Sequence, residues 1–437
     1  MKLKIFLIVI LVMTVICTVF AGCSNIRKDI KIIVKAPTLT MEASFIDSEC
    51  DSAYAFLEKV GADFAMQYEN ANITVAVEQY DNTDEAAAIS NAYGSNDAPD
   101  VLYNDYFTME AHIHDGHVVP VDDIISEDTR ADIDQGFWKQ SMINGKTYMM
   151  PFLYRQNVLV YNKDIFRAAG LEQYISEKDE IQSWSFDEWE HILAALRAYM
   201  PDTSYPIMMY AANNQGDTHI MTYCRIMGSS FFDSDMKFNL ETEEGIAGLR
   251  WIKECADKGY MPKDAEKMNI LDNYDMFMSG QLAIYVCNAG NVPNFNCDFG
   301  LVNFPSINGG CNTNFLTGFE VFDNGDPDRL AIAKAFVRYI YESNYIDYSA
   351  SNIPCSSSVS DKYREALEPM QKYINNSDKS VNFTGGNPNW LGVRDVFYKH
   401  IAELLTGRKS PEEAAKAIDR DCNAAIEAGL RKSNLHE

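Results

Sequence analysis

The sequence predicts a two-lobed α/β protein, and three observations support this prediction. Helix-type and strand-type segments alternate along the chain, as they do in sheets that are covered by helices. The 437 residues exceed what one hydrophobic core usually holds, at about 150 residues per domain. Hydrophobic residues make up 47% of the chain and charged residues 23%, which is typical of a folded globular protein rather than a disordered one.

The N-terminal part of the chain shows a β-α-β-α-β order. Residues 31–35 (KIIVK) predict a strand, and residues 52–68 predict a helix with apolar side chains at helical spacing. A second strand is expected at 73–77, a helix that begins with a polar cap at 83–93, and a third strand at 100–103. This order indicates a parallel sheet with helices on both faces.

Helices and short strands continue to alternate through the rest of the chain. We expect helices at 186–199, 242–258 and 328–341, two more near the C-terminus, and short strands at 158–161, 206–210 (PIMMY), 283–286 and 300–302. Each lobe is therefore expected to be a mainly parallel sheet flanked by helices. Since open α/β sheets bind ligands beyond the carboxyl ends of their strands, two facing lobes would hold a small molecule in the cleft between them.

The N-terminus has the features of an export signal. Two lysines precede an apolar run at residues 5–20, and Ala-Gly-Cys follows at 21–23. A basic start, an apolar core and a small-residue cleavage site predict a signal peptide at 1–22, followed by a linker at 23–30. The alternative is an uncleaved N-terminal membrane helix, which would also hold the rest of the chain outside the cytoplasm.

Cys23, directly after Ala-Gly, resembles the cysteine of the bacterial lipoprotein lipobox, which is acylated and becomes the mature N-terminus. Phe20 departs from the leucine that is usual three residues before this cysteine. The resemblance implies a lipid anchor at Cys23 on the extracytoplasmic face of the cell membrane.

The charge balance restricts the partners of the protein. Lys and Arg number 37 against 63 Asp and Glu, for a formal net charge of -26. This charge repels phosphate backbones and therefore excludes nucleic acid as a natural partner. It also disfavours adsorption to an anionic membrane surface, so any membrane attachment is expected to be covalent or inserted.

The cysteines and histidines indicate no cofactor. Cys287, Cys297 and Cys311 have spacings that suit neither a zinc ribbon nor a redox pair, so buried free thiols are expected, with one bridge inside this trio as the alternative. A histidine cluster (His112, His114, Asp115, His117) offers a zinc or nickel site as an alternative. Gly116 instead indicates a helix C-terminus, where histidine favours the helix dipole, so no metal site is expected.

Four ordered segments carry a resemblance to a known family. They are residues 98–105 (APDVLYND) continuing to 116–123 (GHVVPVDD), residues 144–170, residues 277–291 (FMSGQLAIYVCNAGN) and residues 390–417. Together they resemble extracellular solute-binding proteins of the carbohydrate type, the maltodextrin-binding-protein-like subunits of ABC importers. The specific part of the resemblance is the correct order of these segments at sensible spacing.

The resemblance implies how the chain divides between the lobes. Three crossings are expected near residues 155–156, 317–322 and 352–354. The N-lobe would contain residues 31–155 and 320–352, and the C-lobe residues 157–317 and 355–437.

A sugar site needs donors and acceptors for hydroxyls, and aromatic rings for the C–H faces of the sugar. By the resemblance, Asp105 corresponds to a hydroxyl acceptor and Trp390 to a stacking ring at a helix start. The alternatives are a helix N-cap for Asp105 and a core position for Trp390. Tyr154 and Arg155 lie at the expected hinge, where Arg155 would bind a polar or acidic ligand or, alternatively, a carboxylate of the protein itself.

Further candidates follow from their positions at predicted strand ends and loops. Asn213 and Asn214 follow the predicted strand at 206–210, although asparagine is also a common turn residue. The remaining candidates are Asn288, Asn291, Phe319, Glu320, Glu42 and Ser44.

The motifs of common enzyme classes are missing from the sequence. There is no HExxH, no GxSxG, no P-loop and no GxGxxG that opens a helix. The resemblance therefore implies a monomeric, non-enzymatic, lipid-anchored binding subunit that captures a sugar or oligosaccharide and delivers it to an ABC permease, without a cofactor. The alternatives are a secreted carbohydrate-degrading enzyme, since a carboxylate pair needs no local motif, and a sensor subunit that presents its ligand to a receptor.

Overall fold

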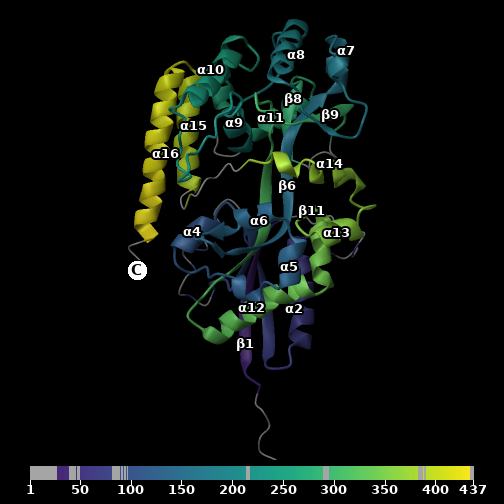
Figure 1. The fold of residues 1–437 in the computed structure, drawn as a ribbon, viewed down its shortest axis with the longest axis vertical. Helices are drawn as coiled ribbons and strands as arrows, with labels where there is room; N and C mark the ends of the chain where they lie inside the picture. Colours follow the sequence, from purple (N-terminus) through teal and green to yellow (C-terminus); the bar gives the residue numbers. More distant parts are fainter. Residues whose placement is uncertain are drawn as a thin grey trace, which may run out of the picture.

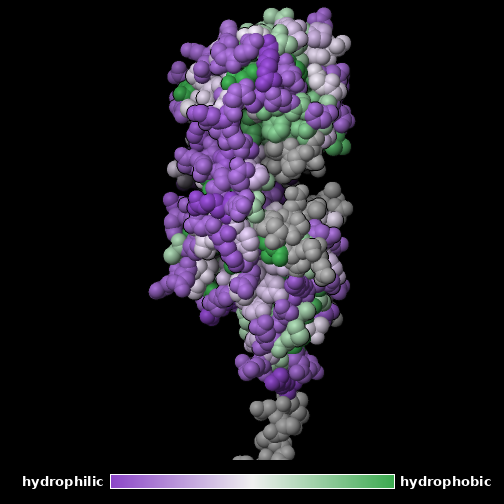
Figure 2. All heavy atoms as spheres, turned by 90° about the vertical axis from the view of Figure 1, so that its right-hand side faces the viewer, coloured by the Kyte–Doolittle hydropathy of each residue, from purple (hydrophilic) through white to green (hydrophobic). Residues whose placement is uncertain are grey.

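The computed structural model describes residues 27–38, 46, 50–80, 89, 92, 95, 97–212, 217–288, 295–381, 387 and 390–433. Figure 1 shows an elongated molecule with a lower and an upper half, joined by long strands. The outline narrows between the two halves at mid-height (Figure 2). The two-lobed α/β fold class predicted from the sequence is confirmed.

The lower half is built on three strands that pair in parallel. Strand β1 (Asp29–Pro37) lies between β2 (Asn72–Tyr80) and β3 (Val101–Asp105). Helix α2 (Ala53–Gln67) connects β1 to β2 and begins where the Ser52 hydroxyl accepts a hydrogen bond from the Ala55 amide. These strands and this helix confirm the predicted order. Most of the helix predicted at 83–93 lies outside the described residues.

Two long strands run through both halves. Strand β6 (Met149–Asn162) pairs antiparallel with β10 (Thr313–Val321), and β10 pairs antiparallel with β3. The register shifts between Thr317 and Gly318. Gly318 is required there, because a Cβ atom would lie 2.2 Å from the Met150 carbonyl oxygen.

The upper half forms around the other end of β6. Strands β8 (Ile284–Asn288) and β9 (Phe299–Val302) pair antiparallel with β6, and β7 (Ile181–Gln182) pairs parallel with β9. The full order is β2-β1-β3-β10-β6-β9-β7, with β8 and β11 (Ile353–Pro354) also paired with β6. The expectation of mainly parallel sheets is therefore correct for the outer strands only, since the strands shared by both halves pair antiparallel.

Helices cover both halves of the sheet. Helix α12 (Pro327–Glu342) packs on α2 and β1, and helix α8 has the bounds that the sequence predicts (Phe186–Tyr199). The predicted helix at 242–258 is α10 (Glu243–Asp257), and the two expected near the C-terminus are α15 (Trp390–Leu405) and α16 (Pro411–Ser433). Residues 206–210 form no strand, contrary to the prediction, although the preceding Tyr205 forms an isolated bridge with Leu282.

The remaining elements are short. They are α4 (Met109–His114), α5 (Glu127–Asp132), α6 (Gln135–Gln140), β4 (Met142–Ile143), β5 (Lys146–Thr147), α7 (Lys163–Ala168), α9 (Asp217–Tyr223), α11 (Ile270–Met278), β11 (Ile353–Pro354), α13 (Ser357–Lys362) and α14 (Gln371–Ile374). The described 3-10 helices have three residues each, except Asn344–Ser351, which has eight. Cys50, Cys224, Cys255, Cys287, Cys297, Cys311, Cys355 and Cys422 are free thiols, as expected. Within the described part of the chain, no helix combines the length and apolar character that a membrane span requires.

The chain passes between the halves a third time after β11. On α13, Ser358 bonds Asp132 of the lower half. Beyond it, Lys372 on α14 forms an ion pair with Asp179 of the upper half. The passage therefore runs between α13 and α14, whereas the lobe boundaries expected from the sequence remain predictions.

Candidate ligand-binding site

The crossing strands bring a set of side chains to one face of the sheet. Residues that pair directly across antiparallel strands have side chains on the same face, and so do residues two apart on one strand. Asp105 pairs with Thr317, Arg155 with Phe315, and Thr313 with Asn157. We call this set the hinge face (Asp105, Arg155, Asn157, Thr313, Phe315, Thr317). It lies where β6 and β10 pass from one half of the molecule to the other.

An ion pair lies at the lower edge of the hinge face. Arg155 Nη2 is 3.3 Å from Asp105 Oδ1, and the Thr317 hydroxyl donates to the same carboxylate oxygen. The side chains of Arg155 and Asp105 are 21% and 27% exposed, so both remain accessible. The N-cap alternative for Asp105 is wrong, because α4 begins after Thr108. The alternative for Arg155, pairing with a carboxylate of the protein itself, is confirmed. Its partner is Asp105, which is itself a predicted site residue.

Unsatisfied polar atoms accompany this pair on the same face. Arg155 Nε, Asn157 Nδ2 and Thr313 Oγ1 are buried without a hydrogen-bond partner in the described structure. Asn157 is 5% exposed and Thr313 is fully buried. Leaving a buried polar group unpaired costs about 1–3 kcal/mol, and such groups are rare in native proteins. Three unpaired groups close together indicate that the hinge face is not optimised for stability alone.

Aromatic rings lie beside the ion pair. The Phe107 ring centroid is 4.9 Å from Phe315 and 5.1 Å from Tyr106. Tyr106 also comes close enough to Arg225 of the upper half to oppose the effect of burial, which lowers the pKa of this guanidinium to about 10. The site thus combines rings, a carboxylate and cations, drawn from both halves of the molecule.

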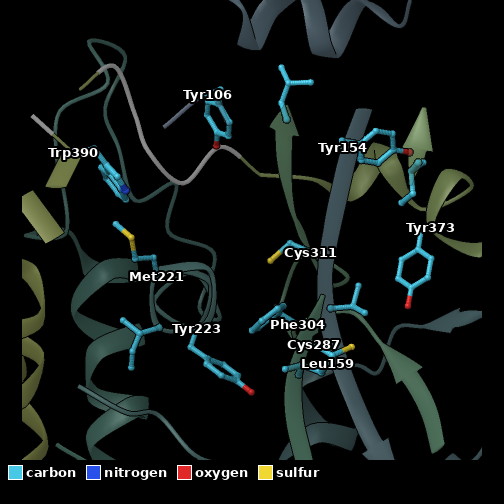
Figure 3. Packing of buried hydrophobic residues seen from close by; sticks show 14 of the residues in the cluster. Tyr106, Tyr154, Leu159, Met221, Tyr223, Cys287, Phe304, Cys311, Tyr373 and Trp390 are labelled. Carbon is cyan, nitrogen blue, oxygen red and sulfur yellow. The ribbon is translucent and has the colours of Figure 1, made fainter. Parts of the chain in front are cut away.

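A hollow lies next to these residues on the upper half. Arg225, Cys311 and Ser380 border a volume of about 620 Å3 together with several serines and Asn308. Figure 3 shows Tyr106 and Cys311 on one side of β6, with Trp390 on that side as well. Residues of this site that were not predicted from the sequence are Tyr106, Phe107, Asn157, Thr313, Phe315 and Thr317. Tyr106 and Phe107 directly follow Asp105, so their position after a strand end was a usable signal.

Three of the predicted site residues lie away from the hinge face. Tyr154 points to the opposite side of β6 (Figure 3), where its ring lies 4.6 Å from Phe137. Phe319 and Glu320 are fully buried in the lower half. Phe319 packs in an aromatic cluster, and Glu320 lies 2.9 Å from His112 Nδ1. All three side chains are buried in this structure, so their contact with a ligand stays a prediction.

Trp390 and Asn288 lie in the upper half. Trp390 is the first residue of α15, as expected, but it is only 2% exposed and belongs to the hydrophobic core, as the alternative held. Asn288 ends β8, pairs with Asn157 and is half-buried. The candidates Glu42, Ser44, Asn213, Asn214 and Asn291, and the lipidation candidate Cys23, lie outside the described residues.

The histidine cluster occupies a helix C-terminus. Helix α4 ends at His114, and Gly116 follows with a φ of 80°. His112 is buried against Glu320, and burial lowers the pKa of His114. Over the residues that the structure describes, no three histidine, cysteine or acidic side chains come together as metal ligands would.

Comparisons with solved structures agree with this fold. A cyclic α-maltosyl-1,6-maltose binding protein from Arthrobacter globiformis superposes with a TM-score of 0.71 at 17% identity, covering 92% of this chain and 100% of its own. The sugar-binding protein MalE from Xanthomonas citri also gives a TM-score of 0.71, at 18% identity and over 93% and 98% of the two chains. The GacH receptor of Streptomyces glaucescens, solved with and without acarbose, gives 0.69 at 19% identity, over 91% and 99%.

Sequence comparisons assign the family. A protein of Brucella abortus described as a binding protein is 19% identical over 333 residues, which are 73% of this chain and 77% of that protein. Residues 51–343, more than half of the chain, match the family described as bacterial extracellular solute-binding protein. This match and the two-lobed fold agree with the resemblance found in the sequence. The chain therefore belongs to the bacterial extracellular solute-binding proteins.

Proposed function

We propose that the protein is a lipid-anchored, extracytoplasmic binding subunit of an ABC importer that captures a sugar or oligosaccharide at the hinge face and delivers it to a membrane permease. The observation that carries this proposal is the joint presence of Asp105, Arg155 and three aromatic rings where the halves meet. The similar proteins from Arthrobacter globiformis and Streptomyces glaucescens support it, because their names include maltose-type or acarbose ligands.

The chemistry of the hinge face suits a polyhydroxyl ligand. A carboxylate accepts hydrogen bonds from sugar hydroxyls, a guanidinium donates to their oxygens, and ring faces cover the C–H groups. Ligand contact with both halves would favour their closed arrangement, by the difference in ligand affinity between closed and open forms. In this proposal residues 31–155 and 320–352 form one lobe, and residues 157–317 and 355–437 form the other.

Isothermal titration calorimetry tests this function. The panel contains maltotriose, acarbose and cyclic maltosyl-maltose, and the wild-type protein is expected to bind at least one of them. Arg155→Ala should weaken that binding about tenfold or more, since a charge-assisted hydrogen bond contributes about 1.5–3 kcal/mol. The control is Arg364→Ala, which removes an exposed arginine whose ion pair is with Asp361, outside the hinge face. Equal affinity in wild type and Arg155→Ala would contradict the proposed site.

The proposed role also excludes turnover of the ligand and requires export. Chromatography of the sugar after long incubation should return it unchanged, whereas cleavage products would favour the enzyme alternative. Mass spectrometry of the protein from membranes should show a lipid on Cys23 as the first residue. A mature chain that retains residues 1–22 would instead support an uncleaved membrane helix.

A further inference from the structure

A second hollow lies on the outer surface of the lower half, apart from the crossing strands. Helices α2 and α12 pack against each other there (Figure 1), and their C-terminal halves border a volume of about 750 Å3. Its lining includes Asp63 and Tyr68 from α2 and the residues after it, and Arg338 and Tyr345 from α12 and the turn that follows. The volume falls within the range of about 300–1,000 Å3 that small-ligand sites occupy.

Aromatic rings form one wall of this hollow. The Phe64 ring centroid lies 5.4 Å from that of Tyr68 and 5.5 Å from that of Tyr339. Tyr339 in turn lies 5.9 Å from Tyr345. Tyr68 and Tyr339 are only half-buried, so part of each ring is accessible. Gln67, near the end of α2, also borders the hollow.

Charged groups line the rest of the hollow. The Tyr345 hydroxyl donates to Asp63 Oδ2, and Arg338 Nε donates to Glu342 Oε1 at 2.8 Å. Among the described residues, none bonds Asp63 Oδ1 or the terminal nitrogens of Arg338. The hollow thus offers a carboxylate acceptor and guanidinium donors next to the faces of preoriented rings.

We propose that this hollow, here called the outer groove (Asp63, Gln67, Tyr68, Arg338, Tyr339, Tyr345), is a second carbohydrate-binding site that takes one or two neutral sugar units. Ring faces beside fixed donors and acceptors are what pyranose rings require. An anionic ligand fits less well, because Asp63 and Glu342 outnumber Arg338 in charge. The outer groove shares no residue with the hinge face and would function independently of it.

Saturation-transfer difference NMR tests the outer groove in the Arg155→Ala protein, in which the hinge face is weakened. The probes are maltotriose and a trimer of N-acetylglucosamine, which represent a soluble oligosaccharide and a cell-wall glycan. At least one probe should receive saturation from the protein. Adding Gln67→Ala and Arg338→Ala, both at exposed positions, should reduce the signal about fivefold, which corresponds to the loss of one hydrogen bond. Arg364→Ala on the same background is the control and should leave the signal unchanged.

Each outcome of this NMR experiment supports or overturns the outer groove as a sugar site. Absence of saturation for both probes in the Arg155→Ala protein, or a signal that Gln67→Ala and Arg338→Ala leave intact, overturns the outer groove as a sugar site. A signal from maltotriose alone identifies the soluble oligosaccharide as the ligand, and a signal from the trimer alone identifies the cell-wall glycan. Tight sugar binding that Arg155→Ala does not affect would contradict the proposed function of the hinge face, and the Gln67→Ala and Arg338→Ala changes would still decide on the outer groove.

Discussion

The two faces of strand β6 differ in how their buried polar groups are hydrogen-bonded. Arg155 and Gln156 are neighbours in sequence and point to opposite sides of the strand. On the Gln156 side, buried amides satisfy one another: Asn376 Nδ2 donates to Gln156 Oε1 at 2.9 Å and to Asn303 Oδ1 at 2.8 Å. On the Arg155 side, three buried polar atoms have no partner in the described structure.

This difference separates stability from binding. The amide network joins β6, the connection between β9 and β10, and the segment that follows α14, since Asn312 also donates to the Asn376 carbonyl at 2.9 Å. A network in which every member is satisfied rigidifies its surroundings. Unpaired groups on the hinge face are costly without a ligand, and a ligand-bound arrangement in which they find partners would recover part of that cost. The hinge face is therefore the side on which binding free energy is available.

Breaking the amide network should give the largest effect. Asn376→Leu removes the partner of Gln156 and leaves both Asn303 amide groups short of a hydrogen bond. Asn303 keeps its bonds to Ser183 and Asn312, so only Gln156 Oε1 is left unpaired, at about 1–3 kcal/mol, and each of the two lost bonds to Asn303 adds about 0.5–1.5 kcal/mol. We therefore expect a loss of about 3–5 kcal/mol in the free energy of unfolding. Urea denaturation followed by circular dichroism measures it. A loss of less than about 1 kcal/mol in the free energy of unfolding would show that the amide network around Gln156 contributes little to stability.

Glu110 on α4 is a third case, a carboxyl group whose burial disfavours its charged form. Burial raises the pKa of Glu110 to about 7, although the Asn387 backbone amide donates to it. The unfolded pKa is near 4.3, so between about pH 4.3 and pH 7 the folded protein binds more protons than the unfolded chain. This group therefore makes stability fall as the pH rises through that window.

Glu110→Gln removes the titration and keeps an acceptor for the amide. At pH 8 the variant should be more stable than wild type by about 1–3 kcal/mol, and at pH 4 the two should differ little. Chemical denaturation at several pH values gives both curves. Parallel curves for wild type and variant would contradict the raised pKa.

Replacing an unpaired polar group of the hinge face by an apolar one should have the smallest effect on stability. It should stabilise the protein, whereas breaking the amide network should destabilise it. Thr313→Val keeps the shape of the fully buried side chain and removes its unpaired hydroxyl. We expect the ligand-free protein to gain about 1 kcal/mol. Thr317→Val is the matched control and should destabilise, because the Thr317 hydroxyl donates to Asp105. If both variants destabilise alike, the two hydroxyls are equivalent and Thr313 is not an unsatisfied group.

Much of the fold could be predicted because its signals are local. Helix α8 begins with a capping box formed by Ser185 and Glu188, and its predicted and observed bounds agree. Strand β6 was predicted only at residues 158–161, since thirteen of its fourteen residues are buried and its sequence lacks the alternation of a half-exposed strand. The third crossing, expected from the resemblance near residues 352–354, stays a prediction; the helix that follows it, α13, contacts Asp132 of the lower half.

The site could be predicted only in part, because its residues come together through the pairing of strands that are distant in sequence. Asp105 and Arg155 are detectable as a strand-end and a hinge residue, whereas Thr317 meets them only through pairing with segments 162 and 212 positions away. Phe319 pairs with Tyr103, two residues further into the lower half than the Asp105–Thr317 pair, and it packs there against Phe152 and Tyr341. Which residues near a strand end reach the site depends on pairing between distant segments, and no local pattern in the sequence shows it.

A crystal structure of the protein with a bound oligosaccharide tests the central claim most directly. The account predicts sugar hydroxyls within hydrogen-bonding distance of Arg155 and Asp105, a sugar ring against Phe107 or Phe315, and an intact amide network around Gln156 on the opposite face. A sugar bound between the halves without contact to Arg155 or Asp105, or bound on the Gln156 side of β6, would contradict it.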